Sequence, residues 1–473
     1  WKTSERMQLM EHNNDFMRTR PISKLLMSMS IPMMLSMLIQ SLYNIVDSIY
    51  VSRLGTQALT AVSLAFPLQN IVLSVAVGVG VGITSAVSIH LGARRREAAN
   101  RAATIGMALT VLHCILFVVF GIFVTRPFLE LFTGDTVTLE MACEYTYIVL
   151  CISFGNLLQI AMEKIFQAVG AMKTTMVLLA TGSVINIVLD PILIFGFAGI
   201  PPMGVAGAAI ATVIGQIGAF FLYVVVYMKK RKVFPVTIHL KYLKMDWSII
   251  KQIYSVGIPS TIMTALPSIL ISALNGFLAA FSDVYVAVLG VYFKLQTFIY
   301  MPANGIVQGM RPIVGYNYGA GEYARVRKAI RYSLLYTAAI MLIGTVAALF
   351  IPGQIFALFD AEPTLLEAGV EALRIISLGF LVSTIGVIHS GTFEALGMGR
   401  ESLIISLLRQ FAITIPLGFL LSRFWGPAGI WASFPISELC ASIVAYILLK
   451  RTHNGDFSPY SFGKNRKREK ITE

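Results

Sequence analysis

Charged residues are scarce in this chain. Of its 473 residues, 13% are Asp, Glu, Lys or Arg and 56% are hydrophobic, and the mean hydropathy is +0.75. A soluble domain keeps about a quarter of its residues charged, because its surface faces water. The shortage excludes an ordinary soluble domain and favours a protein whose surface lies in lipid.

Cysteines and catalytic motifs are also lacking. The four cysteines have neither the spacing of metal ligands nor that of a disulfide framework, so we expect small buried apolar side chains. The sequence contains no HExxH, nucleophile elbow or phosphate-binding loop, and we expect neither enzymatic activity nor a cofactor. The cysteines are Cys114, Cys143, Cys151 and Cys440.

Long apolar stretches lie between the charged residues and predict an all-α polytopic membrane protein with twelve transmembrane helices. Most stretches are long enough to cross a bilayer, which takes about 20 residues. The stretch 174–228 is long enough for two spans, and glycines and prolines between 196 and 204 divide it. The predicted spans are 24–53, 54–93, 102–125, 145–162, two within 174–228, 252–282, 284–312, 332–352, 375–393, 402–422 and 427–449.

Lysine and arginine are distributed unevenly over the loops. If the spans alternate in direction, 30 of the 37 Lys and Arg residues lie on one side of the membrane and 4 on the other. Such an excess marks the cytoplasmic side, so both termini and the central loop are predicted to be cytoplasmic. The net charge of +13 follows from this bias, and we expect no nucleic-acid partner.

The two halves of the chain are similar at a constant offset of 227 residues. Ile31-Pro32 corresponds to Ile258-Pro259, and Gly92 corresponds to Gly319. Each half has six predicted helices, so both enter the membrane from the same side and form parallel repeats. The predicted segments are a cytoplasmic tail (1–24), an amino-terminal lobe (25–228), a cytoplasmic linker (229–251), a carboxy-terminal lobe (252–449) and a basic cytoplasmic tail (450–473).

Two aspartates lie within predicted spans. Asp190 is the only charged residue between Lys173 and Lys229, and Asn186 lies one helical turn before it. Asp47 follows Tyr43 by one turn. A charged residue is costly in a bilayer and is retained where it faces a cavity. Burial favours the protonated carboxyl group, which suits proton uptake, whereas the same oxygens also suit Na⁺.

The alternative for these aspartates is a place near a helix end, where each is hydrated or caps the helix. This alternative is stronger for Asp47, which precedes Arg53 by only six residues.

Five stretches of the sequence resemble the multidrug and toxic compound extrusion (MATE) family, in its prokaryotic form. They are YNIVDSIYVSRLG (43–55), INIVLDPILIF (185–195), GVAGAAIAT (204–212), PIVGYNYGAG (312–321) and FEALGMGR (393–400). The resemblance covers about residues 20 to 450. It implies two lobes in a V shape and export of organic cations or other amphipathic drugs, driven by H⁺ or Na⁺ through alternating access.

The resemblance also implies roles for single residues. Tyr43, Asp47, Asn186, Asp190 and Thr212 match the family's cation site in the amino-terminal lobe. Asp47, Asn186 and Asp190 are the metal ligands if the coupling ion is Na⁺. The resemblance implies that Pro32 is a bending point in the first helix.

The carboxy-terminal half departs from this pattern, because its first helix contains no acid and Leu274 stands opposite Asp47. Glu163 and Glu394 are expected at helix ends, in surface pairs with Lys164 and Arg400. Glu438 is expected to pair with Arg409 or Arg423. The residues predicted to line a substrate cavity are Gln40, Lys294, Asn304, Gln308 and Arg409.

A second function remains open, that of a flippase for lipid-linked oligosaccharides or lipids in the same superfamily. Such a flippase is expected to line its cavity with several cationic side chains, and candidates here are few. The expected partners are a small-molecule drug and membrane lipids, and the expected state is a monomer in the cell inner membrane. The sequence leaves open the substrate and the choice between H⁺ and Na⁺.

Overall fold

The computed structural model describes residues 16–197, 199–357 and 363–454. Helices and their connections account for all of this part of the chain, and no strand occurs in it. The prediction of an all-α protein is therefore confirmed.

The amino-terminal half contains one short and seven long helices. They are α2 (Phe16–Thr19), α3 (Ile22–Ser52), α4 (Thr56–Gly92), α5 (Arg96–Glu130), α6 (Thr136–Cys151), α7 (Phe154–Ala168), α8 (Met172–Phe195) and α9 (Gly204–Lys230).

The carboxy-terminal half repeats this order with three differences: a 3₁₀ turn precedes it, a short helix, α13, is added, and a π-helical turn divides one helix into α16 and α17. Its elements are η1 (Leu240–Tyr242), α10 (Trp247–Ala279), α11 (Asp283–Gly319), α12 (Tyr323–Phe350), α13 (Pro352–Ala357), α14 (Pro363–Ser377), α15 (Phe380–Ala395), α16 (Gly399–Leu407), η2 (Leu408–Ala412), α17 (Thr414–Trp425) and α18 (Pro427–Asn454).

Ten helices in the described residues are long and apolar enough to cross a membrane, and two bent pairs bring the number to twelve. The pair α6–α7 bends by 43° and the pair α14–α15 by 53°. Several helices are longer than their predicted spans. For example, α5 covers Arg96–Glu130, whereas the span 102–125 was expected. The prediction counted only uncharged residues, but the helix continues through charged residues at both ends.

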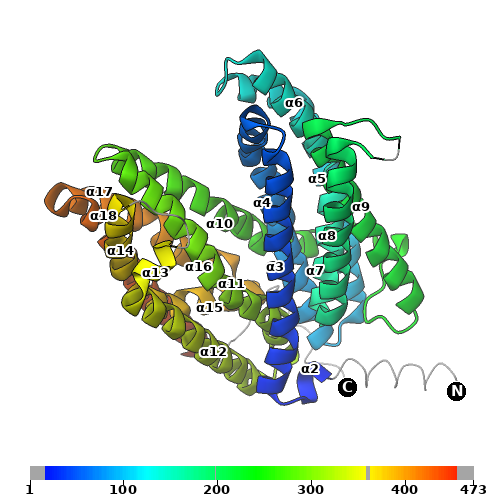
Figure 1. Ribbon diagram of the computed structural model, residues 1–473. Coiled ribbons are helices and arrows are strands. Elements are labelled where there is room, and N and C mark those ends of the chain that lie inside the picture. The colour runs from blue at the N-terminus through cyan, green and yellow to red at the C-terminus, as the bar shows by residue number, and fades with distance from the viewer. Residues whose placement is uncertain (1–15, 198, 358–362, 455–473) are drawn as a thin grey trace, which may run out of the picture.

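The two halves form two lobes that converge at one end and diverge at the other, as Figure 1 shows. Helix α2 lies at the converging end, and the lobes spread apart toward α6 and α17. The carboxy-terminal part of α4 packs against the amino-terminal part of α10, and α11 packs against α3 and α4. The V shape that the resemblance implied is therefore present.

Glycines allow the lobes to approach closely at the converging end. An ideal Cβ at Gly92 would lie 1.8 Å from the Tyr316 carbonyl oxygen, and one at Gly319 would lie 2.0 Å from the Ile89 carbonyl oxygen. Only residues without a Cβ fit such a backbone approach. Both members of one contact are 227 residues from those of the other, so the lobes meet through an approximate two-fold axis.

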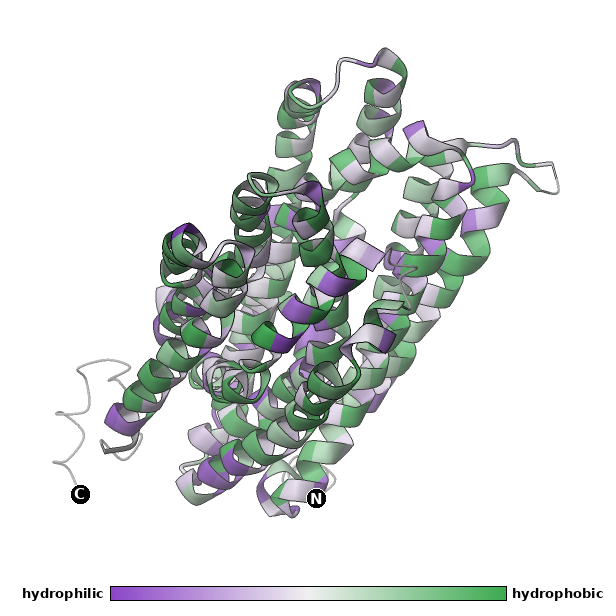
Figure 2. Ribbon diagram, turned by 60° about the vertical axis from the view of Figure 1, so that its left-hand side comes forward, coloured by the Kyte–Doolittle hydropathy of each residue, from purple (hydrophilic) through white to green (hydrophobic). Residues whose placement is uncertain are grey.

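The outer faces of the helices are apolar along their length (Figure 2). On α5, five large aliphatic or aromatic side chains form an exposed stripe. Such a continuous apolar surface is typical of a face that contacts lipid. The stripe consists of Leu112, Ile115, Leu116, Val119 and Phe123.

Candidate functional site

Helices α8 and α9 hold a polar site inside the amino-terminal lobe. Asp190 is fully buried and Asn186 is 3% exposed. The two helices approach closely because Gly182 and Gly215 face one another: a Cβ at Gly215 would lie 3.0 Å from the Gly182 carbonyl oxygen. This approach brings Thr212 of α9 beside the polar face of α8.

The amide of Asn186 connects the two helices. In one orientation its nitrogen lies 3.4 Å from Asp190 Oδ1 and 3.3 Å from the Thr212 hydroxyl oxygen. In the opposite orientation the nitrogen donates to Asp190 Oδ2 at 3.3 Å, and the amide oxygen accepts from the Thr212 backbone N–H at 3.1 Å. The second orientation satisfies both ends of the amide, and it still leaves the carboxyl group of Asp190 in contact with a donor.

Helix α3 brings a second carboxyl group to the same place. The side chains of Asp47 and Asp190 are within hydrogen-bonding reach of each other. Tyr43 and Tyr145 lie close enough to interact with both acids electrostatically. Two ionised carboxylates at such a separation repel each other, and a shared proton or a bound cation removes the repulsion.

No basic side chain of the described residues forms an ion pair with Asp47 or Asp190. One oxygen of Asp47, Oδ1, is buried and has no hydrogen-bond donor within the same part of the chain. Carboxylate, amide and hydroxyl oxygens are the donors that hard cations prefer. The site can therefore take up a proton or a small hard cation such as Na⁺.

The site of these two carboxyl groups lies against a cavity of about 270 Å³, which is enclosed mainly by α3, α7, α8 and α9 of the amino-terminal lobe and bounded on one side by α11. Tyr43, Asn186 and Thr212 are part of the cavity wall, and Gln40 and Gln308 line it as well. Asp190 is not in the wall but lies behind Asn186. A molecule in the cavity thus contacts the side chains that surround the acids.

The remaining cavity candidates lie elsewhere. Asn304 and Arg409 line a larger cavity of about 610 Å³ on the side of the carboxy-terminal lobe. Arg311 lines both cavities. Lys294 is exposed and lines neither.

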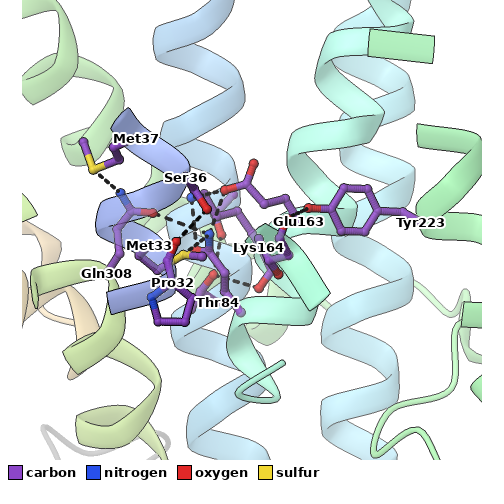
Figure 3. Close-up of polar contacts among 12 residues, drawn as sticks. Pro32, Met33, Ser36, Met37, Thr84, Glu163, Lys164, Tyr223 and Gln308 are labelled. Carbon is purple, nitrogen blue, oxygen red and sulfur yellow. Dashed lines mark hydrogen bonds and ion pairs between the residues drawn. The ribbon is translucent and has the colours of Figure 1, made fainter. Parts of the chain in front are cut away.

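Helix α7 carries a charged cluster that was expected on the surface. Glu163 and Lys164 are 8% and 6% exposed, and Lys164 Nζ lies 3.0 Å from Glu163 Oε1. Gln167 donates to the same oxygen at 2.7 Å. Figure 3 shows the cluster beside Pro32 and Gln308. The prediction that Glu163 and Lys164 lie on the surface was wrong. Gly80 has no side chain, so the aliphatic part of Lys164 packs against α4.

Pro32 is buried within α3, which remains helical through it. The proline ring removes one backbone donor from the helix. The hydroxyl of Ser36 donates to the Pro32 carbonyl oxygen at 2.8 Å. The role of Pro32 as a bending point stays a prediction.

Glu394 is also buried, at 4% exposure. It accepts from Ser260 at 2.7 Å and pairs with Arg311, not with Arg400. The expectation of a surface pair was wrong here too. Arg311 precedes Glu394 by 83 residues, so their contact could not be predicted from spacing along one helix. The offset of 227 places Glu394 opposite Gln167, so corresponding positions of the two lobes hold polar side chains at the lobe interface.

Glu438 pairs with Arg409, one of its two expected partners. The pair has two bonds, Arg409 Nε to Glu438 Oε2 and Arg409 Nη2 to Glu438 Oε1, each 2.8 Å long. Arg423 is instead exposed and lies over the Phe419 ring, 4.8 Å from its centroid.

Comparisons with known proteins agree with this architecture. The sequence model of the MatE family matches residues 32–192 and again residues 259–420. The multidrug export protein MepA of Staphylococcus aureus (strain MSSA476) is 28% identical over 444 residues, covering 91% of this chain and 95% of MepA. A crystal structure of MATE in the bent conformation has a TM-score of 0.88 at 25% identity and covers 95% of this chain and 99% of that chain. An outward-facing multidrug resistance MATE family transporter of the MOP superfamily has a TM-score of 0.87 at 25% identity, covering 93% and 98%.

Proposed function

The chain belongs to the MATE family of membrane transporters, and on this premise we propose that it is a secondary active multidrug exporter that exchanges organic cations or other amphipathic drugs for H⁺ or Na⁺. Membership in a transporter family also agrees with the prediction that the chain is not an enzyme. The multidrug substrate class is carried over from the relatives that are named for it.

The observation that carries the proposal is the pair of acids inside the amino-terminal lobe. Asp47 and Asp190 are within hydrogen-bonding reach and have no basic partner among the described residues. Asp190 lies behind a cavity wall that includes Asn186 and Thr212, and Asp47 lines a separate cavity of about 330 Å³ between α3 and α4. An ion bound there removes the repulsion of the carboxylates. A cationic drug in the cavity favours the ionised acids, so the drug and the ion disfavour each other's binding. That antagonism is what exchange requires.

The lobe arrangement supports alternating access. The lobes are in contact at the end that carries α2 and are apart at the other (Figure 1). The distribution of Lys and Arg predicts that both termini are cytoplasmic, which places the closed end on the cytoplasmic side. This state therefore faces outward. Bending of α3 at Pro32 is our proposed route by which ion binding changes the cavity, because the proline weakens the helix between the converging end and Asp47.

A flippase for lipid-linked oligosaccharides receives less support. Its anionic pyrophosphate needs available cationic side chains, but the basic residues of the two cavities are paired with acids. Lys164 pairs with Glu163, Arg311 with Glu394 and Arg409 with Glu438.

The test is transport by the purified full chain in proteoliposomes. Efflux of a fluorescent organic cation is measured under a proton gradient alone, a Na⁺ gradient alone and no gradient. We expect one of the gradients to drive efflux above the rate without a gradient, and the one that does identifies the coupling ion. Absence of driven efflux for a panel of cations contradicts the proposal and favours the flippase.

A further inference from the structure

The larger cavity has a charge arrangement unlike that of the carboxyl site. Its volume is about 610 Å³. Most of its lining comes from α10, α11, α15, α16, η2 and α18, and residues of α3 and α4 close it on the side of the amino-terminal lobe. Phe293, Tyr300 and Phe434 give it an aromatic wall, and Arg409 and Glu438 also line it. A largely apolar cavity with a few fixed polar groups is typical of a small-molecule site.

The ion pair of Arg409 and Glu438 is held in a defined geometry. The side chains are 12% and 13% exposed, and the two parallel bonds of 2.8 Å make the contact bidentate. Arg409 belongs to the π-helical turn η2, which interrupts the span formed by α16 and α17. π-Helical turns of this kind often occur at functional sites. Gly386 leaves room for the arginine stem, since a Cβ there would lie 3.2 Å from Arg409 Cδ.

Two further polar groups surround the pair. The oxygen Oε1 of Gln410, on the same turn, is buried in the cavity wall and has no donor among the described residues. The hydroxyl of Tyr300 donates to Ser383 at 2.8 Å and is close enough to Arg409 to interact with it electrostatically. An unpaired buried acceptor is unfavourable, so Gln410 gains a bond when its side chain turns toward a donor on a bound molecule.

The two lobes therefore differ in charge. The acids of the amino-terminal site lack a basic partner, whereas both acids of the larger cavity, Glu394 and Glu438, are paired with arginines. A simple cation gains little from a carboxylate that is already neutralised. A simple anion would have to compete with Glu438 for Arg409 and would leave a buried carboxylate unpaired, which is strongly unfavourable.

A zwitterion avoids both penalties. Its carboxylate can accept from N–H groups of Arg409 that Glu438 does not use, while its ammonium group donates to Glu438 and to Oε1 of Gln410. All four charges then have a partner of opposite sign. We propose that the Arg409–Glu438 pair is a substrate subsite for zwitterionic amphipathic molecules, separate from the ion-coupling acids. This inference rests on the proposed transport function and adds a substrate class to it.

The experiment compares two probes with the same aromatic body. One is a fluoroquinolone, a zwitterion at neutral pH, and the other is its methyl ester, a cation. Binding to the purified full chain in nanodiscs is measured by fluorescence polarisation without any gradient. The variant Arg409→Gln/Glu438→Gln removes both charges and leaves no buried charge unpaired, so it is expected to fold. The matched control is Arg423→Gln, which removes an exposed guanidinium outside the cavity.

We expect the double variant to raise the Kd of the zwitterion by about tenfold or more and that of the ester by less than about twofold, since only the zwitterion loses charge-assisted bonds. Arg423→Gln should change neither Kd. An equal loss for both probes, together with a lower unfolding temperature, shows that the pair only holds η2 to α18 and overturns the proposal. Unchanged binding of both probes overturns it as well.

The same proteins are then tested for efflux in proteoliposomes. If no probe is exported by the unmodified chain, the proposed transport function fails, while the difference in binding between the two probes still decides whether the subsite exists. The two failures are therefore distinguishable.

Discussion

Replacing Asp190 with Asn is the most direct test of ion coupling in this protein. Asparagine has nearly the shape of aspartate, but it can neither carry a charge nor exchange a proton. Asp190 is fully buried, and its described partners are Asn186 and Asp47. The substitution therefore changes the charge of the site while leaving the packing of α8 in place.

The expected cost in stability is small. The new amide oxygen can still accept from Asn186, and the amide group can donate to Asp47. Exchange of one buried hydrogen bond for another changes the free energy of unfolding by about 1 kcal/mol. Removal of the repulsion between two carboxyl groups acts in the opposite direction. We expect the variant to insert, to purify and to unfold at nearly the unmodified temperature.

The expected loss in coupling is large. For one-to-one exchange, a tenfold ion gradient provides about 1.4 kcal/mol, which sustains a drug gradient of about tenfold. Without an exchangeable ion at residue 190, the drug ratio under the same gradient should fall to about one. Asp47→Asn should have nearly the same effect, because it removes the other half of the pair.

The assay is accumulation of a fluorescent cation in proteoliposomes at matched protein content, with Asp283→Asn as the control. Asp283 is exposed in the first turn of α11, so its neutralisation should leave the drug ratio unchanged. A drug ratio near the unmodified value in Asp190→Asn would falsify the assignment of Asp190 to coupling and leave it a buried structural acid.

Three further predictions concern topology, packing and a buried ion pair. A cysteine introduced at Thr237 should be labelled only from the cytoplasm and one at Asp135 only from outside; labelling of both from one side contradicts the twelve-span topology. Glu394→Gln leaves the partly buried Arg311 without its carboxylate, so stability should fall by about 1–3 kcal/mol, measured as a lower unfolding temperature; an unchanged temperature contradicts the pairing. Ala at Gly92 or at Gly319 should cost about 1–3 kcal/mol each, and a clear inequality between the two in thermal unfolding argues against the two-fold contact.

The number and order of the helices could be predicted because they depend on one property that is visible in the sequence. Charged residues are excluded from the hydrocarbon, so the gaps between them mark the spans. The same property singled out Asp190, since nothing else between Lys173 and Lys229 is charged. Asn186 was found by helical spacing. Thr212 was known only from the resemblance, because it lies on another helix.

The charged clusters at the lobe interface could not be predicted in the same way. Charge at a predicted helix end usually indicates a hydrated surface, and that rule failed for Glu163 and Glu394. Whether such a residue is buried depends on what packs against its helix, and Gly80 on α4 is what makes room for Lys164. The partners of Glu394 come from two other helices. The sequence does not contain the distances between these helices, so it could not predict which side chains contact Glu394.

The converging end holds the lobes together in two ways. Their backbones approach closely at glycines such as Gly92 and Gly319, and one buried apolar cluster, which includes Met29 and Met310, continues from one lobe into the other. Two ion pairs also hold this end together: Arg18 of α2 to Glu322 at 2.7 Å, and Arg101 of α5 to Asp246, which precedes α10, at 3.5 Å.

All four of these side chains are between 27% and 39% exposed, so each pair contributes at most about 1 kcal/mol. Separation therefore costs little in ion pairs, and its main cost is exposure of the apolar cluster that the lobes share at this end. An ion or a drug shifts this equilibrium only by the difference in its affinity for the two states. The strong, buried pairs, Arg311–Glu394 and Arg409–Glu438, lie within the carboxy-terminal lobe. A rocking movement can therefore open the converging end while those pairs, and the lobe that they hold together, stay intact.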